Sequence, residues 1–176
     1  RYASTKSYAK PVVKIEISCL SLSVPYEMKP ISSLIQQVCS VEFGEDIDDA
    51  FNQTVRIVSP ARTFLEKAFL LCEEFQKDKP RTGRMSRHLY DLDKLSRTKY
   101  MHKALEDRNL YLEIVKHREK FYHPSYVDYG KELPEVIDFL PPAAVVEAFR
   151  DDYNDMLGSF IYEKDALSFD ELLSSV

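Results

Sequence analysis

Apolar and polar residues alternate at two places in the first third of the chain, and both places predict strands. The first alternation runs over residues 12–20 and puts Val13, Ile15, Ile17 and Cys19 on one face. The second is shorter and covers residues 54–58. Because two strands alone do not make a stable sheet, we expect them either to pair with strands outside this sequence or to form a small platform that helices cover.

Two prolines shape the stretch between these strands. Pro25 and Pro30 predict a loop, and Pro30 is also suited to open a short helix, because its fixed φ matches the first helical position. The apolar residues of that helix are Ile31, Leu34, Ile35 and Val38. The acidic run over residues 45–49 is typical of a loop.

From residue 59 onward the apolar positions follow a helical period. Ser59 and Pro60 supply an N-cap and a first helical residue, which predicts a helix to about residue 77. Pro80 ends this helix, and Ser86 is placed to cap a second one that runs to about residue 97. Further helices are expected over 99–106, 108–122, 142–160 and 169–173, with a long, partly ordered linker over 123–141.

Composition agrees with a globular protein that is α+β and mostly helical. Apolar residues make up 44% of the chain, and nine prolines with only four glycines argue against a turn-rich sandwich. No apolar run is long enough for a membrane span, and no signal peptide opens the chain. Cys19, Cys39 and Cys72 include no C-x-x-C pair, which indicates reduced core thiols in a cytoplasmic protein rather than a zinc site.

The charge of the chain is unevenly distributed. The net charge of −5 argues against a protein that coats nucleic acid in general. Residues 84–103 nevertheless carry a net charge of +4, whereas residues 128–171 carry −9. This asymmetry indicates a polyanion or phosphate bound to the basic stretch, and the alternative is a mixed, solvated surface.

Glu16 is the first candidate for chemistry. It lies between Ile15 and Ile17 on the polar face of the first predicted strand. A carboxylate there is suited to a magnesium ion, which prefers oxygen ligands and completes its shell with substrate phosphates. The alternative is an ordinary exposed glutamate on a half-solvated sheet.

Lys67 is the second candidate. A helical projection puts it at the border of the apolar face, between Leu70 and Leu71. An ammonium group at that position either extends to solvent or has an acidic partner, because burying it alone is costly.

The third candidate is the basic segment at the start of the helix over residues 86–97. Arg84, Arg87, His88 and Asp91 share one flank of that helix. Two arginines and a histidine at a helix start suit phosphate oxygens, through charge-assisted hydrogen bonds and the helix dipole. The alternative is a local surface pair between Arg87 and Asp91, worth about 0.3–0.5 kcal/mol.

Two of these segments together resemble a known family. V-S-P-A-R-T-F-L-E-K over residues 58–67, followed by S-R-H-L-Y-D-L over 86–92, is similar to the AbiEii/AbiGii-type nucleotidyltransferases, which are toxins of bacterial toxin–antitoxin and phage-abortive systems. Residues 152–156 and 168–173 also resemble the end of that family, and the resemblance covers roughly 12–175.

The resemblance implies a polymerase-β-like nucleotidyltransferase that moves NMP from an NTP to tRNA, another RNA or a protein, with Mg²⁺ as cofactor and an antitoxin as partner. Residues 1–58 would be the C-terminal part of its α/β domain, with a remnant of the sheet, and 59–176 its helical domain. The I-E-I triplet of Glu16 matches the family's third metal-site carboxylate. Lys67, Arg87 and Asp91 match its helical lysine, basic residue and aspartate.

The G-S motif and the D-x-D pair of that superfamily do not precede Glu16. Asp46 and Asp48 spell D-x-D, but they follow Glu16 in an acidic run. Since the chain also begins with Arg1 rather than methionine, we expect the C-terminal portion of a longer enzyme, inactive alone.

The expected roles follow from the chemistry of nucleotidyl transfer, which needs positioning and charge neutralisation. Lys67 would contact the triphosphate, assisted by Arg84, Arg87 and His88, while Asp91 would hold a cation or touch the nucleotide. Glu16 would complete the metal site and help to deprotonate the attacking hydroxyl. The alternative function is a helical binding module, without catalysis, that recognises a partner or polyanion through its basic strip.

Overall fold

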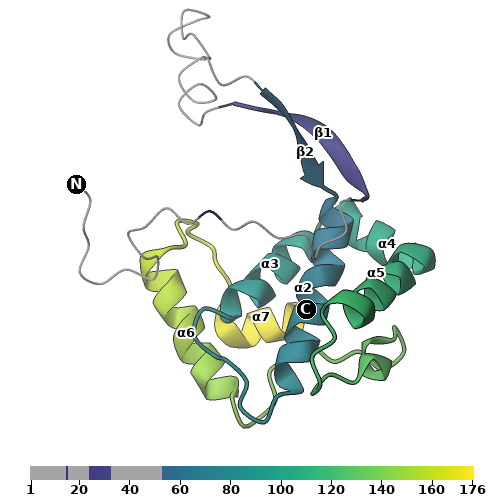
Figure 1. Cartoon of the computed structure of the whole chain (residues 1–176). Coiled ribbons are helices and arrows are strands. Elements are labelled where there is room, and N and C mark those ends of the chain that lie inside the picture. The colour runs from purple at the N-terminus through teal and green to yellow at the C-terminus, as the bar shows by residue number, and fades with distance from the viewer. Residues whose placement is uncertain (1–14, 16–23, 33–52) are drawn as a thin grey trace, which may run out of the picture. The chain divides into compact units, whose positions relative to one another are not determined.

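The computed structural model describes residue 15, residues 24–32 and residues 53–176. Within these residues the fold is α+β and mostly helical, as predicted, with one two-stranded antiparallel sheet and six α-helices (Figure 1). The chain divides into a hairpin unit within Ser23–Ser59 and a unit that contains all the helices. The elements are β1 (Tyr26–Ile31), β2 (Gln53–Val58), α2 (Pro60–Phe75), α3 (Ser86–Ser96), α4 (Lys99–Glu106), α5 (Arg108–Phe121), the 3-10 helix η2 (Tyr129–Glu132), α6 (Val146–Ser159) and α7 (Phe169–Ser175).

The hairpin unit confirms one predicted strand and corrects a predicted loop. β2 covers the alternation predicted over 54–58, but its partner is β1, in the stretch that Pro25 and Pro30 predicted to be a loop. Pro30 lies inside β1 opposite Thr54, so its expected role as a helix start is wrong. Proline is tolerated there because each strand of a hairpin has one free edge, where no backbone donor is required. The strand predicted over 12–20, apart from Ile15, and the rest of the predicted helix after Ile31 lie outside the described residues.

The helical unit has one core built around α2. Because α2 contacts α3, α4 and α5, it is buried on most of its circumference, and α3 in turn contacts α6 and α7 (Figure 1). The fully buried side chains of this core include Leu65, Phe69, Leu71, Leu89, Leu92, Ile114, Phe149, Tyr153 and Leu172. Cys72 is a buried free thiol, as predicted, and burial raises its pKa. No helix within the described residues is long and apolar enough to cross a membrane.

The helix starts agree with the sequence except at α3 and α6. Thr98, Asp107 and Ser168 cap α4, α5 and α7 with their side chains. Ser86 was expected to cap α3, but it is the first residue of that helix and its hydroxyl instead donates to Asp152. At Pro142 the chain forms a turn that accepts from the amides of Val145 and Val146, and α6 begins only at Val146.

A buried cluster of charges joins α2 to α5. Arg118 of α5 donates to both oxygens of Glu73 at 2.8 and 2.6 Å and also pairs with Glu66, the residue before Lys67. Arg62 pairs with Glu66 at 3.0 Å. Because Arg118 is almost fully buried, these bonds fix the rotation of α2 about its axis, and with it the direction in which Lys67 leaves the helix.

Glu132 is a fully buried acid beside this cluster, and the described residues offer no donor to its carboxylate oxygens. Burial and the charge of Glu73 raise the pKa of Glu132 to about 8, against the opposing charge of Arg118. The acid is therefore protonated at neutral pH and able to donate to Glu73. In the unfolded chain the same group loses its proton near its ordinary pKa of about 4.3.

The substitution Glu132→Gln is expected to change how stability depends on pH. The folded protein holds a proton on Glu132 that the unfolded chain releases, so wild-type stability falls as pH rises from about 5 through about 8. Glutamine keeps the shape and a donor but has no proton to lose. We expect equal stability near pH 5 and a variant that is about 1–3 kcal/mol more stable near pH 9. Urea unfolding near pH 5 and near pH 9 measures the difference in stability. Stability that changes equally with pH in the two proteins would contradict the prediction. Glu135→Gln, at an exposed site, is the control.

Candidate functional site

Lys67 and Asp91 form an ion pair between α2 and α3. The Nζ atom of Lys67 lies 2.6 Å from Oδ2 of Asp91. The lysine side chain is 21% exposed and the aspartate side chain 43%. Lys67 thus has an acidic partner rather than extending alone into solvent, and both side chains of the pair remain partly exposed.

Arg87 lies one helical turn before Asp91 on the same helix. Its side chain is exposed and, among the described residues, makes no hydrogen bond or ion pair. The local Arg87–Asp91 pair offered by the sequence is therefore not formed, since Asp91 binds Lys67. Arg87 is a guanidinium group available to a ligand beside the Lys67–Asp91 pair.

His88 is buried next to the pair and is a neutral imidazole. Burial, together with the positive charges of Lys67 and Arg87, lowers the pKa of His88 to about 4, against the opposing charge of Asp91. Its Nδ1 atom is buried and has no hydrogen-bond partner within the described residues. At neutral pH this side chain adds no positive charge to the site, so its contribution to anion binding is a hydrogen bond rather than a charge.

The first turn of α3 is already occupied by an acid of the protein. The carboxylate of Asp152, on α6, accepts hydrogen bonds from the backbone amides of Arg84 and Ser86 and from the Ser86 hydroxyl. Arg84 adopts a left-handed conformation with φ of 60° that turns its amide toward this carboxylate. The amides of Arg84 and Ser86 are therefore satisfied internally, so of the side chains and helix dipole expected to bind phosphate, the side chains carry the charge that remains.

Part of the basic stretch over 84–103 is neutralised by neighbouring acids. Lys94 pairs with Glu163 at 2.6 Å, and Arg97 pairs with the buried Asp93 at 2.7 Å. Lys99 and Lys103 lie over the ring of Tyr100 instead. The continuous basic strip that the sequence indicated is thus divided into a part beside Lys67 and a part on α4.

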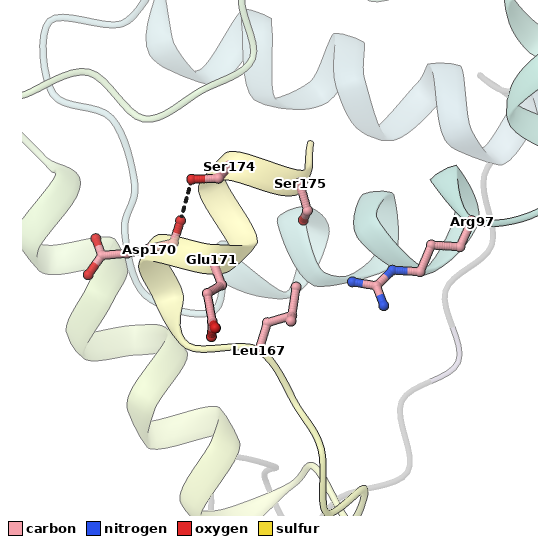
Figure 2. Close-up of a pocket in the computed structure, with 6 residues that line it drawn as sticks. All are labelled: Arg97, Leu167, Asp170, Glu171, Ser174 and Ser175. Carbon is pink, nitrogen blue, oxygen red and sulfur yellow. Dashed lines mark hydrogen bonds between the residues drawn. The ribbon is translucent and has the colours of Figure 1, made fainter.

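A shallow hollow of about 430 Å³ lies beside α7 and the end of α3, and none of the predicted site residues lines it. Figure 2 shows the side chains that line it. Arg97 contributes its cation there, but this side chain is already paired with Asp93. Two of the lining residues are acids that repel a phosphate. We therefore do not assign the nucleotide to this hollow, which is lined by Arg97, Leu167, Asp170, Glu171, Ser174 and Ser175.

Glu16 lies outside the described residues, so its distance from Lys67 and Asp91 stays a prediction. Within the residues that are described, no group of three His, Cys, Asp or Glu side chains is placed to hold a metal ion. The expected magnesium site thus receives no support from this part of the chain.

Two residues whose contacts shape the surroundings of the site were assigned no role from the sequence. Arg118 occupies an apolar position of α5, at helical spacing from Tyr111, Ile114 and Val115, and a cation at such a position signals a buried partner. Asp152 gives no comparable signal, because its partners on α3 are more than sixty residues away in sequence.

The chain is similar to one known protein family over nearly its whole length. Residues 1–175 match the family described as Nucleotidyl transferase AbiEii toxin, Type IV TA system. No curated protein and no solved structure matches the chain. Since the match extends over nearly every residue, the chain belongs to the AbiEii nucleotidyl transferase toxin family.

Proposed function

We propose that this chain is the C-terminal portion of a toxin–antitoxin nucleotidyltransferase and that its helical unit supplies the triphosphate side of the active site. The observation that carries the proposal is the 2.6 Å contact between Lys67 and Asp91 with Arg87 exposed one turn away. Two cations and an acid from neighbouring helices, all at least partly exposed, suit a polyphosphate better than a neutral ligand.

Each side chain of this site has a separate task in the proposal. Lys67 neutralises charge on the phosphates, and Arg87 binds phosphate oxygens through its planar guanidinium group. Asp91 keeps the flexible lysine pointed at the ligand before the nucleotide arrives. His88, held neutral, offers a hydrogen bond without adding charge. Together these groups position the triphosphate for in-line attack.

The proposed catalytic acids lie outside the helices that carry Lys67, Arg87 and Asp91. Glu16 is the proposed metal-side carboxylate, and residues 1–58 are the proposed end of a polymerase-β-like α/β domain. The G-S and D-x-D motifs are absent before Glu16, so we infer that this chain alone does not turn over. The whole enzyme would transfer NMP from an NTP, with Mg²⁺, to tRNA, another RNA or a protein, and an antitoxin would oppose it in the cytoplasm.

A non-catalytic binding module is the less well supported function. It requires a basic strip that is free to meet an acidic partner. Lys94 and Arg97 are neutralised by Glu163 and Asp93, which leaves less free charge on α3 than the sequence indicated. Lys67 is likewise poorly placed for docking a large partner, because it is mostly buried.

Arg87→Ala is the substitution that tests the proposed site in this chain. We expect calorimetric titration with ATP, GTP, CTP and UTP, each with Mg²⁺, to show binding of at least one nucleotide. Loss of the guanidinium group should weaken that binding by about 10- to 150-fold, since a hydrogen bond to a charged group is worth about 1.5–3 kcal/mol. Arg108→Ala, which removes an exposed arginine of α5, should leave it unchanged. No binding by the wild type, or equal losses in the two variants, would exclude the proposed site.

A further inference from the structure

We propose that Asp152 is a positioning residue, which fixes the first turn of α3 and thereby sets how Arg87, His88 and Asp91 approach Lys67. The importance of this geometry for nucleotide binding rests on the proposed function. The geometry itself rests only on contacts within the helical unit. Asp152 lies in the segment over residues 152–156 that resembles the end of the family, but the resemblance implied no role for it.

The contacts of Asp152 define a three-point anchor. One carboxylate oxygen accepts from the amide of Arg84, and the other accepts from the amide of Ser86, at 3.0 Å, and from its hydroxyl. Ser86 is fully buried, so water cannot replace these bonds. An anchor of one carboxylate to three donors is stronger than an ordinary helix cap, which satisfies one or two.

The anchor is directly connected to the site by the chain. Arg87 and His88 are the two residues after Ser86, and Asp91 follows one turn later. Leu89 and Leu92 of α3 are buried in the core, which fixes the middle of the helix. The first turn has no side-chain cap of its own, because Met85 holds the N-cap position. Asp152 therefore supplies the side-chain hydrogen bonds that hold the start of this turn, in addition to the buried Met85 and the backbone bonds around it.

The environment of His88 provides a local readout of this anchor. If the first turn loosens in Asp152→Ala, the imidazole becomes hydrated and its pKa rises from about 4 toward 6.5. Loss of the negative charge of Asp152 alone would lower the His88 pKa, because removing an anion near a histidine disfavours its charged form. The direction of the change thus separates positioning from a plain charge effect.

The experiment is an NMR titration of the His88 imidazole in the full chain. We expect a rise of at least about one pKa unit in Asp152→Ala, and a smaller rise in Asp152→Asn, which keeps one carbonyl acceptor. Ser86→Ala, which removes only the hydroxyl bond and serves if Asp152→Ala does not fold, should also give a small rise. Asp107→Ala removes the cap of α5 and is the control for a general loss of stability.

An unchanged or lowered His88 pKa in the Asp152 variants would overturn the proposal, as would an equal rise in Asp107→Ala. Nucleotide binding is measured on the same samples, and we expect Asp152→Ala to weaken it about three- to tenfold. Should the pKa rise while the wild type binds no nucleotide, positioning by Asp152 would stand and the proposed function would fail. If the wild type binds nucleotide and the His88 pKa stays unchanged in the variants, the proposed function would stand and positioning by Asp152 would fail.

Discussion

Arg118→Met is expected to lower the free energy of unfolding by about 3–5 kcal/mol, the range for removing one partner of a buried ion pair. Arg118 binds both oxygens of Glu73 and also pairs with Glu66. Although burial acts against its charge, these acids raise the pKa of Arg118 above its ordinary value, so it stays charged when folded. Methionine fills a similar volume but leaves Glu73 buried without its cation. Urea unfolding of the variant and wild type measures the loss.

The double variant Arg118→Met with Glu73→Gln separates the two causes of that loss. If the cost comes from an uncompensated carboxylate, removing the charge of Glu73 should restore about half of it or more. Lys120→Met, which changes an exposed lysine of the same helix, should stay within about 0.5 kcal/mol of wild type. A loss below about 1 kcal/mol in Arg118→Met would show that the cluster does not stabilise the contact between α2 and α5.

The helical unit was predictable because its helices carry local signals. The Ser59–Pro60 start, the apolar stripe of α3 and the capping box of α7 are all contained within one or two turns of sequence. The β1 strand was missed because proline is read locally as a breaker, whereas its effect depends on whether the partner strand needs a donor at that position. That information lies more than twenty residues away, in β2.

The candidate site was predictable only in part, for the same reason. The position of Lys67 at the border of an apolar face indicated a partner, but nothing local named Asp91 as that partner. The neutral state of His88 follows from burial by other helices and from the charges of Lys67 and Arg87. The use of the α3 amides by Asp152 depends on where α6 packs, which no pattern within α3 records.

If the proposed function holds, Lys67→Met should lower nucleotidyl transfer by at least about 100-fold, measured in an enzyme that also carries the proposed G-S and D-x-D motifs. Removing one group that stabilises charge in the transition state commonly lowers kcat by about 100- to 1,000-fold. The fold should survive, because Asp91 is 43% exposed and stays hydrated once its partner is gone. We therefore expect unfolding in urea to change by less than about 1 kcal/mol. Transfer of a labelled nucleotide to RNA or protein measures the activity.

Lys94→Met is the matched control for this substitution. Lys94 also forms a 2.6 Å ion pair that joins α3 to another segment, but its partner is Glu163 and its side chain is more exposed, at 37% against 21% for Lys67. Equal losses of activity in the two variants would mean that any broken ion pair on α3 impairs the enzyme, and retained transfer in Lys67→Met would remove the lysine from the mechanism.

Asp91→Asn then decides what the acid contributes to the pair. If Asp91 only neutralises Lys67, its removal frees the ammonium group, so nucleotide affinity rises and transfer is kept. If Asp91 aims the lysine, as we propose, the lysine regains the rotamers of a long flexible side chain and the rate of transfer falls, whatever happens to affinity. Comparing kcat with KM in Asp91→Asn distinguishes these cases, because a lysine that still binds but no longer points at the reacting phosphate lowers kcat first.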